Sequence, residues 1–525
     1  MMRSTSLKHF AVASLFALCV ASAHLRAQTV HIAQGTLAGA TTAGISSFKG
    51  IPFAAPPVGD LRWKPPVPAK PWSGTRQAKA FGSACMQNLR RDTLPWTREF
   101  MVQNDASEDC LTLNVWTPHA SSTANLPVLV FIHGGGFGEG SGGIDVYNGA
   151  NLAKQGVVVV TINYRLGVFG FLAHPALTAE SPNHSSGNYG LLDCLEALHW
   201  VHGNIAAFGG DPRRVTIWGQ SAGAFAVGAL LASPVAKGSF SGAIADSGLG
   251  HAGGVTQPLA DAEKDGEAYA VSRNAPSLAA LRAIPAAELI KAPLPQGVRF
   301  RPAIDGWFLT ELPAAAMEDG TGSDVPVITG YQSEDARSLT RPDGALAAYQ
   351  TRIHTLYGDK ADEALRLYPV INGDSGVAAA SEAMSHDRNR VNQWLLATRR
   401  AAHNHSATYT YFMDQAIPWP QHPEYGAFHT GELPYAFANL DKLDRPWTDK
   451  DREVSRTLSG YVVNFTKTGS PDGGGLPNWP RVTEAQKQTM ELGVHFRPMP
   501  LADPAREAFW VAFLTSEDAA KSPTF

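Results

Sequence analysis

The sequence predicts an α/β protein with a large, mostly parallel central sheet and helices on both faces. Three runs of apolar, often β-branched residues support this prediction, at residues 128–132, 157–162 and 215–218. Strands that are buried on both faces have such continuous runs, whereas half-exposed strands alternate. Stretches of helical character occur at residues 191–205 and 222–231. Strands that alternate with helices favour a parallel sheet covered on both sides.

Further elements are expected in the second half of the chain. A shorter apolar run at residues 325–328 predicts a fourth buried strand. Apolar residues recur at helical spacing between positions 458 and 465, and this helix should end at the Gly-Ser-Pro sequence of residues 469–471. The Pro- and Gly-rich segments at residues 52–68 and 473–480 are interpreted as surface excursions and not as domain boundaries.

Composition limits the classes of protein that this chain can belong to. It has 525 residues, of which 44% are hydrophobic and 17% charged, so it can bury a large core. Length alone suggests about three domains of roughly 150 residues. The chain has no internal repeat and no long linker, so residues 28–525 are expected to form one large domain with loop and helical insertions. A net charge of −4 without a dense Lys/Arg stripe argues against nucleic acid as a partner.

The N-terminus has the features of a secretory signal peptide. Two basic residues precede an apolar stretch at residues 10–20, and the small-residue sequence ASA follows at residues 21–23. This stretch is shorter than the roughly 20 residues that a spanning helix needs, which favours a cleaved signal over a stable membrane anchor. Cleavage is expected after Ala23 or after Ala27. We therefore expect an exported protein, either periplasmic or extracellular.

Removal of the signal leaves three cysteines, Cys85, Cys110 and Cys194. An oxidising compartment permits one disulfide and one free thiol among them. Cys194 lies in the sequence LLDCL, which predicts a buried helical face, and a buried thiol behaves as a small hydrophobe. Cys85 and Cys110 bracket a polar segment and are the pair that we expect to be bonded.

Ser221 is the candidate nucleophile. It lies in the sequence GQSAG at residues 219–223, directly after a predicted strand and before a predicted helix. A sharp strand-to-helix turn exposes a strained serine, and small residues must flank it to avoid clashes. A Gly-x-Ser-x-Gly sequence is common by chance, but its position between strand and helix makes this one specific.

A glycine-rich loop after the first predicted strand is a candidate oxyanion hole. The sequence HGGGF occupies residues 133–137, and its glycines let backbone N–H groups approach a substrate closely. The candidate donors are the N–H groups of Gly135, Gly136 and Ala222, and one such donor contributes about 3 kcal/mol to transition-state stabilisation. The alternative is a merely flexible turn. His133 is expected to be structural.

A serine nucleophile needs a base, and the base needs a carboxylate that fixes its tautomer. The run at residues 325–328 leads to the adjacent carboxylates Glu334 and Asp335. His429, in a loop before a helical stretch, fits the chain order of serine, acid and histidine. Spacing alone does not select it over other histidines of this part of the chain, which are His403, His405 and His422.

Six short sequences, in order, resemble those of the type-B carboxylesterases, the family of cholinesterases and bacterial para-nitrobenzyl esterases. They are FKGIPFA at 48–54, SEDCLTLNVW at 107–116, HGGG at 133–136, FGGDP at 208–212, PAIDG at 302–306 and GAFHTGE at 426–432. The resemblance runs from about residue 29 to about residue 495. It implies the α/β-hydrolase fold and hydrolysis of small-molecule carboxylic esters through an acyl-enzyme intermediate, with no metal or organic cofactor.

The resemblance also implies roles for individual residues. It matches Asp335 to the acid, His429 to the base, Ser247 to a serine that supports the triad, and the Cys85–Cys110 pair to a family disulfide. The family usually has Asp-Glu-Gly at the acid, whereas this chain has Glu-Asp-Ala at residues 334–336. Because Asp is one methylene shorter than Glu, the acid loop must lie closer to the base.

The residue before the nucleophile bears on substrate charge. Cholinesterases have a carboxylate there, whereas this chain has the neutral Gln220, so we expect neutral esters to be preferred to choline esters. Trp96 offers an aromatic face that attracts cations, which is the opposing consideration.

Three alternatives use the same fold. A lipase would need an apolar lid, but the segment between Cys85 and Cys110 mixes apolar with charged residues. An amidase would use the same triad. A non-catalytic adhesion-type homologue typically lacks the nucleophile, whereas Ser221 is present.

Overall fold

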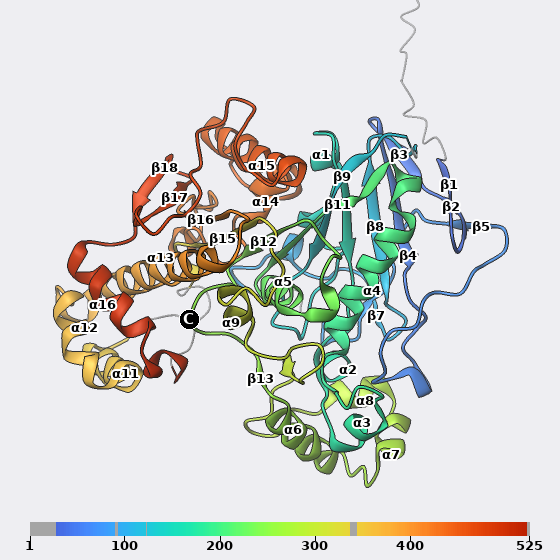
Figure 1. Cartoon of the computed structure of the whole chain (residues 1–525), viewed down its shortest axis with the longest axis horizontal. Coiled ribbons are helices and arrows are strands. Elements are labelled where there is room, and N and C mark those ends of the chain that lie inside the picture. The colour runs from blue at the N-terminus through green and yellow to red at the C-terminus, as the bar shows by residue number, and fades with distance from the viewer. Residues whose placement is uncertain (1–27, 90–92, 122, 336–343, 522–525) are drawn as a thin grey trace, which may run out of the picture.

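A computed structural model of the chain describes residues 28–89, 93–121, 123–335 and 344–521 (Figure 1). The predicted signal peptide, residues 1–27, lies outside the described residues, as does Ala336. A central sheet, eleven-stranded in the described part of the chain, confirms the predicted α/β class. From one edge to the other its strands are β3 (Ala40–Thr42), β4 (Ile45–Pro52), β8 (Thr112–Thr117), β10 (Val158–Ile162), β9 (Leu126–Ile132), β11 (Gly210–Gln220), β12 (Gly242–Asp246), β15 (Val327–Gln332), β16 (Thr408–Met413), β17 (Gln488–Leu492) and β18 (Phe496–Pro500).

The strands of this sheet are parallel in the middle and antiparallel at both edges. Each neighbouring pair from β10 to β17 is parallel, and the pairs outside them are antiparallel. The carboxyl ends of the parallel strands therefore share one edge of the sheet, and loops that follow them can meet there. The predicted mostly parallel sheet is confirmed.

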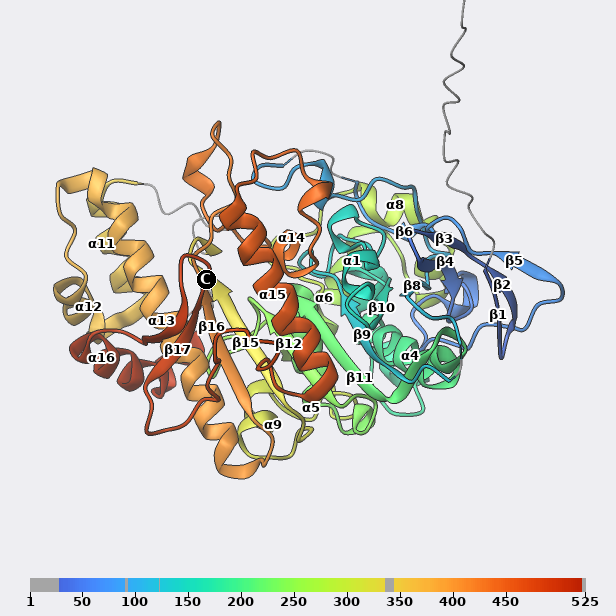
Figure 2. The same cartoon turned by 90° about the horizontal axis from the view of Figure 1, so that it is seen from above.

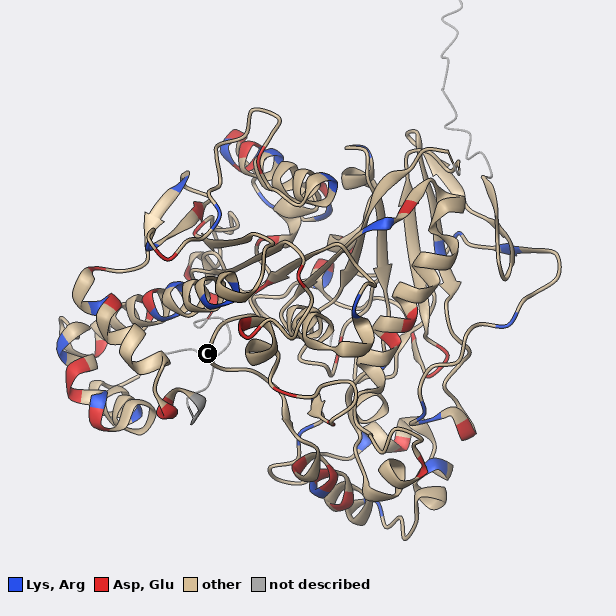
Figure 3. Ribbon diagram, in the orientation of Figure 1, with Lys and Arg blue, Asp and Glu red and all other residues tan. Residues whose placement is uncertain are grey.

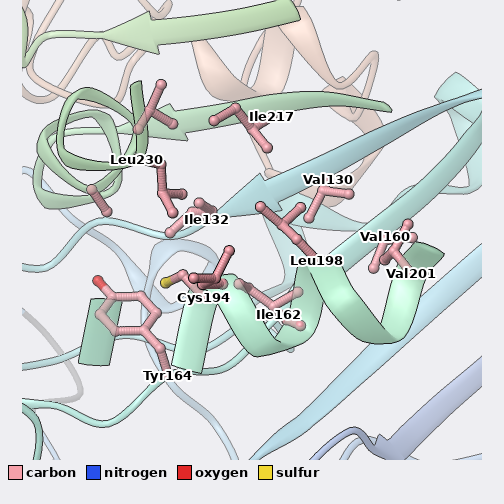
Figure 4. Close-up of a cluster of buried hydrophobic side chains, with 14 of the residues drawn as sticks. Val130, Ile132, Val160, Ile162, Tyr164, Cys194, Leu198, Val201, Ile217 and Leu230 are labelled. Carbon is pink, nitrogen blue, oxygen red and sulfur yellow. The ribbon is translucent and has the colours of Figure 1, made fainter. Parts of the chain in front are cut away.

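Helices cover both faces of the sheet (Figures 1 and 2). They include α4 (Tyr189–Asn204) and α5 (Ala222–Ala232) on one face, and α15 (Asp449–Thr468) on the other. Alternate residues of β9 point to opposite faces, so Val130 packs in one hydrophobic cluster with Leu198 and Leu230, whereas Phe131 packs in another with Phe465 (Figure 4). Burial on both faces explains why this strand has no polar alternation.

The four predicted strands and three predicted helices are present. The strand predicted at residues 215–218 is the apolar end of the longer β11. The strand predicted at residues 325–328 begins later, at Val327, after a proline that lacks an N–H group. Helix α15 begins with a capping box between Thr448 and Asp451 and ends at Gly469, whose φ of 77° is left-handed.

The remaining helices form smaller groups around the sheet. At one end of the molecule α11 (Leu346–Tyr357), α12 (Ala361–Leu367), α13 (Val377–His403) and α16 (Pro504–Leu514) share a hydrophobic cluster (Figure 2). The other α-helices of the described residues are α1 (Ala150–Ala153), α2 (Gly167–Phe171), α3 (Pro175–Glu180), α6 (Leu259–Ser272), α7 (Leu278–Ala283), α8 (Ala286–Lys291), α9 (Pro313–Glu318) and α14 (Leu433–Ala436). Short strands outside the main sheet are β1 (Thr29–Ile32), β2 (Gly35–Ala38), β5 (Thr75–Gln77), β6 (Ala84–Cys85), β7 (Ala106–Ser107), β13 (Gln257–Pro258) and β14 (Ala303–Ile304).

Charged residues of both signs are interspersed along the ribbon (Figure 3). No helix within the described ranges is both long enough and apolar enough to cross a membrane. The structure joins Cys85 to Cys110 in a disulfide, as the sequence predicts. Cys194 is a free, buried thiol in the core between α4 and the sheet (Figure 4), and burial holds its pKa well above the usual value.

Candidate active site

Ser221 occupies the turn between β11 and α5. Its backbone has φ 57° and ψ −123°, a conformation that is strained for a residue with a side chain. The turn is so tight that a Cβ at Gly219 would lie 2.1 Å from the carbonyl oxygen of Gly223. A Cβ at Gly223 would lie 2.0 Å from the carbonyl oxygen of Ile132. Both flanking positions therefore require glycine, which explains the Gly-x-Ser-x-Gly sequence.

His429 and Asp335 are joined by a buried side-chain contact. His429 Nδ1 lies 2.6 Å from Asp335 Oδ1, and both side chains are almost fully buried. The other carboxylate oxygen of Asp335 accepts hydrogen bonds from Ser247 Oγ at 2.7 Å and from the backbone N–H of Gln332 at 2.9 Å. This arrangement assigns a proton to His429 Nδ1 and leaves Nε2 as the ring atom able to accept a proton. The structure thus brings together the acid, the base and the supporting serine that the resemblance implies.

Glu334, the second candidate acid, faces a different group. Its Oε2 accepts a hydrogen bond from the backbone N–H of Ala427 at 2.7 Å and another from Ser333 Oγ. Glu334 thus binds the backbone of the loop that carries His429, whereas Asp335 contacts the imidazole ring of His429. The adjacent carboxylates point to two parts of the same loop.

The other candidate histidines are placed elsewhere. His403, the last residue of α13, and His405, which follows the helix, are exposed, and His422 contacts Glu424 at 3.0 Å. Of the four histidines that the sequence left open, His429 is the one beside Asp335.

The glycine loop lies against the serine. A Cβ at Gly134 would be 2.9 Å from the Cβ of Ser221, so backbone and nucleophile are in contact. Gly135 and Gly136 have φ values of 107° and 60°, and all three glycines line the same cavity as Ser221. Ala222 is the first residue of α5, where backbone N–H groups lack partners within the helix. The predicted oxyanion donors are thus adjacent to the nucleophile.

His133, which precedes the glycines, is buried and uncharged. Burial lowers the pKa of His133 to about 4. Its ring stacks on Tyr164 with 4.5 Å between centroids, and its Nδ1 lies 2.8 Å from the carbonyl oxygen of Gly134. The neutral ring donates this hydrogen bond and supports the glycine loop, as a structural histidine would.

A cavity of about 270 Å³ contains these groups. Its residues come from the Cys85–Cys110 loop, the segment after β9, the serine turn and the histidine loop. They are Gln87, Thr93, Trp96, Phe100, Met101, Val102, Gly134, Gly135, Gly136, Glu139, Gly140, Ile144, Tyr147, Gln220, Ser221, His429 and Thr430. Apolar side chains form part of the wall beside these polar groups, a mixture that is common in small-molecule sites.

Several of these wall residues were not identified from the sequence. Gln87, the residues at 100–102, Ile144 and Tyr147 belong to segments with no periodic pattern. They reach the cavity only because the loops that carry them fold over it. The family-like sequence around Cys110 indicates the disulfide but does not indicate which residues line the cavity. Gln220, which the sequence singled out, is buried and places its Nε2 3.3 Å from His429 Nε2.

A smaller cavity of about 40 Å³ lies between the sheet and α15 and contains two buried carboxyl groups. Asp246 accepts hydrogen bonds from Trp218 Nε1 at 2.5 Å and Tyr411 Oη at 2.8 Å, yet burial raises its pKa to about 6. Neither carboxyl oxygen of Glu432 has a hydrogen-bond partner within the described residues. Burial, and then the charges of Asp246 and Asp335, raise the pKa of Glu432 well above its usual value. Burial therefore favours the protonated, uncharged form of Glu432.

Across the part of the chain that the structure describes, no cluster of three or more His, Cys, Asp and Glu side chains could hold a metal ion.

Comparison with known proteins assigns the same chemistry. A sequence model described as the carboxylesterase family matches residues 26–510. Fumonisin B1 esterase of Sphingopyxis macrogoltabida is 39% identical, over 86% of this chain and 83% of that protein. Para-nitrobenzyl esterase of Bacillus subtilis strain 168 is 36% identical, over 89% and 94%. A solved structure of PNB esterase superposes with a TM-score of 0.76 at 32% identity and covers 92% of this chain and all of that one.

Proposed function

This chain belongs to the carboxylesterase family and is a carboxylic ester hydrolase, and from that premise we propose that Ser221, His429 and Asp335 are its catalytic triad. The observation that carries the proposal is the 2.6 Å contact between His429 Nδ1 and Asp335 Oδ1, with Ser221 in the same cavity. Asp335 orients the ring and stabilises it when it is protonated, which leaves Nε2 to exchange a proton with substrate and serine.

The reaction proceeds by two acyl transfers. Ser221 Oγ attacks the ester carbonyl carbon while His429 Nε2 takes the hydroxyl proton. The N–H groups of Gly135, Gly136 and Ala222 donate hydrogen bonds to the oxyanion that forms. The carbon–oxygen bond to the alcohol then breaks, and His429 returns the proton to the departing oxygen. Water repeats these steps on the acyl-enzyme and releases the carboxylic acid.

We further propose that neutral esters with apolar groups are the preferred substrates. The walls near Ser221 are formed by Trp96, Phe100, Met101, Ile144 and Tyr147, which favour apolar groups. Directly beside the nucleophile lies the uncharged amide of Gln220, which gives no coulombic attraction to a cation. The half-buried carboxylate of Glu139, also in the wall, is the group that would favour cations instead.

Export is part of the proposal. The basic residues, apolar stretch and small residues at positions 1–27 support a signal peptide, and the Cys85–Cys110 disulfide suits an oxidising compartment. Protein recovered from the periplasm or medium should begin at His24 or Gln28. An intact N-terminus on cytoplasmic protein would contradict export.

A substrate panel tests the proposed activity. The relatives are named for para-nitrobenzyl esters, fumonisin B1 and cocaine, so family membership does not by itself select the alcohol. We therefore suggest nitrophenyl esters of increasing acyl length, esters of varied alcohols, and a nitroanilide to separate esterase from amidase. For every ester that is hydrolysed, kcat/KM of the wild-type protein should far exceed kcat/KM of Ser221→Ala. Equal hydrolysis by the two proteins would reject Ser221 as the nucleophile.

A further inference from the structure

The Cys85–Cys110 loop contacts both halves of the catalytic machinery. Gln87 is hydrogen-bonded beside the glycine loop, and Trp96 is hydrogen-bonded to the loop of His429. We propose that Gln87 and Trp96 are positioning residues through which this disulfide-closed loop holds the oxyanion hole and the base in register. The inference rests on the proposed triad and glycine-loop roles.

Gln87 makes a two-point contact with the backbone. Its Nε2 donates to the carbonyl oxygen of Gly140 at 2.8 Å, and its Oε1 accepts from the N–H of Gly140 at 2.8 Å. The same Nε2 donates to the carbonyl oxygen of Cys85 at 2.8 Å. The side chain is 6% exposed, so water does not compete strongly for these hydrogen bonds. Gly140 is thereby joined to the residue that bears the disulfide.

Gly140 is in turn packed against the start of the glycine loop. A Cβ on it would lie 2.3 Å from His133 Nδ1 and 2.7 Å from the carbonyl oxygen of Gly134. Between them, the carbonyl oxygen of Gly135 accepts hydrogen bonds from the N–H groups of Gly138 and Glu139, both at 3.0 Å. This closed turn has little freedom to deform, so a displacement of Gly140 moves the proposed oxyanion donors with it.

Trp96 links the same disulfide-closed loop to the loop that carries His429. Its Nε1 donates to Thr430 Oγ1 at 3.0 Å and to the carbonyl oxygen of His429 at 3.2 Å. Thr430 has a φ of 79°, which β-branched residues rarely adopt, so its backbone needs external support. A second contact reinforces the link, because Phe100 packs edge-on against Phe428 with 5.7 Å between ring centroids.

Position matters here because a shift of about 1 Å in a catalytic group can cost on the order of a hundredfold in rate. Gln87 and Trp96 also line the cavity, so each is either a wall that contacts substrate or a support for the catalytic groups. A wall residue contributes equally to ground and transition states and changes KM, whereas a support changes kcat.

The test compares Gln87→Leu and Trp96→Phe with matched controls. Gln87→Leu removes all three side-chain hydrogen bonds at similar volume, and Trp96→Phe keeps an aromatic wall without a donor. Gln103→Leu is the control for the first, because Gln103 is an exposed residue of the same loop whose side-chain partners among the described residues are the nearby Arg98 and Met101. Trp447→Phe is the control for the second, because its Nε1 bonds the carbonyl oxygen of Leu443 outside the cavity.

We expect each test variant to lose about tenfold in kcat with KM changed less than about twofold, and each control to stay within about twofold of wild type. Trp96→Phe should also move the acid limb of the kcat/KM pH profile, because a displaced ring loses part of its contact with Asp335. Gln87→Leu should leave that limb in place and weaken inhibition by a trifluoromethyl ketone, which forms an oxyanion.

A double-mutant cycle separates direct coupling from general loosening. Thr430→Val removes one acceptor of the Trp96 hydrogen bond, so Trp96→Phe/Thr430→Val should lose less activity than the product of the two single losses. If Gln87→Leu does not fold, Gln87→Asn, which is too short to make both contacts, replaces it. A rise in KM alone, additive single losses, or equal losses in the controls would overturn the proposal. If Ser221→Ala hydrolysed the ester as fast as wild type, the proposed function itself would be rejected instead.

Discussion

Asp335 and His429 are 94 positions apart in the chain, yet Oδ1 of one lies 2.6 Å from Nδ1 of the other. The contact depends on two parallel neighbours, β15 and β16, because the acid follows one strand and the histidine loop follows the other. The second oxygen of Asp335 is held by Ser247 and by the backbone of Gln332. Asp335 thus has a fixed orientation before any substrate binds.

Removal of the proposed nucleophile gives the most direct prediction. Ser221→Ala should lower kcat by a factor of roughly 10⁴ or more, and His429→Ala should be almost as severe because the two residues act as a unit. Steady-state hydrolysis of a nitrophenyl ester, with a burst experiment for the acyl-enzyme, measures both. A variant that kept a tenth of wild-type turnover would show that another residue is the nucleophile.

The adjacent carboxylates should differ sharply in their effect. Asp335→Asn should lower kcat by about 10⁴, because the amide favours the wrong imidazole tautomer. Glu334→Gln should lose about tenfold at most, because it weakens one hydrogen bond to the Ala427 backbone and leaves the ring contact intact. Comparison of kcat for the two variants at saturating ester decides between them; equal losses would mean that Asp335 is not the triad acid.

The sequence predicted the frame of the molecule because that frame depends on local patterns. Apolar runs identified β9, β10, β11 and β15, because strands buried on both faces consist mainly of apolar residues. The strand β16, by contrast, alternates threonine with tyrosine over residues 408–411 and was not predicted. Its polar groups are satisfied by partners distant in sequence, such as the Tyr411 hydrogen bond to Asp246. Those partners are not apparent from a linear pattern.

The residues of the candidate site also fall into those that local sequence patterns predict and those that they do not. Ser221 and the glycine loop follow strand ends in the sequence itself, so their positions could be predicted. The base and acid were selected by resemblance, because spacing left four histidines and two carboxylates open. The supports from Gln87 and Trp96 were not predicted at all, since they join backbone atoms 53 and more than 300 positions away.

The disulfide should contribute measurably to stability. It closes a loop with a sequence separation of 25, which in the chain-entropy model corresponds to roughly 3 kcal/mol. Urea unfolding of wild type and of a Cys85→Ala/Cys110→Ala variant should differ by about that amount. Mass mapping without reductant should recover the two half-cystines in one linked peptide pair, and recovery of both as free thiols from exported protein would contradict the bond.

Glu432 predicts an unusual pH dependence of stability. Its pKa is raised in the folded state, so the unfolded chain releases this proton at lower pH than the folded protein does. Its contribution to stability is therefore complete below the ordinary pKa of a glutamic acid, near 4.3, and is lost as pH rises toward the folded-state value. The side chain at this position in Glu432→Gln does not titrate, so the variant lacks this pH-dependent contribution.

Urea unfolding of wild type and Glu432→Gln at several pH values between 4 and 9 measures the effect. As pH increases, the free energy of unfolding of the variant should rise relative to that of wild type. Asp246 also has a raised pKa, and because the two carboxyl groups interact electrostatically its titration contributes to the measured difference. A constant difference across this range would mean that Glu432 is not buried as a neutral acid.

The proposed preference for neutral esters rests on the groups nearest Ser221. Gln220 is fully buried with its amide 3.3 Å from His429 Nε2, at the position where a carboxylate would attract a choline group. Gln220→Glu should therefore raise kcat/KM for a choline ester more than for an uncharged ester. Trp96 lines the cavity, but its indole nitrogen is engaged by the histidine loop, so it contributes only an aromatic face.

The decisive comparison is kcat/KM for a choline ester against its uncharged carbon isostere, at low and at high salt. Wild type should prefer the isostere, and salt should change the ratio little, because no strong coulombic term distinguishes the two substrates. Glu139, the carboxylate in the cavity wall, is the rival source of attraction. Preference for the choline ester that salt weakens and Glu139→Gln removes would identify Glu139 as an anionic site and reject the neutral-ester proposal. The same preference surviving Glu139→Gln would reject it as well and would point to the face of Trp96, because attraction to an aromatic ring does not depend on that carboxylate.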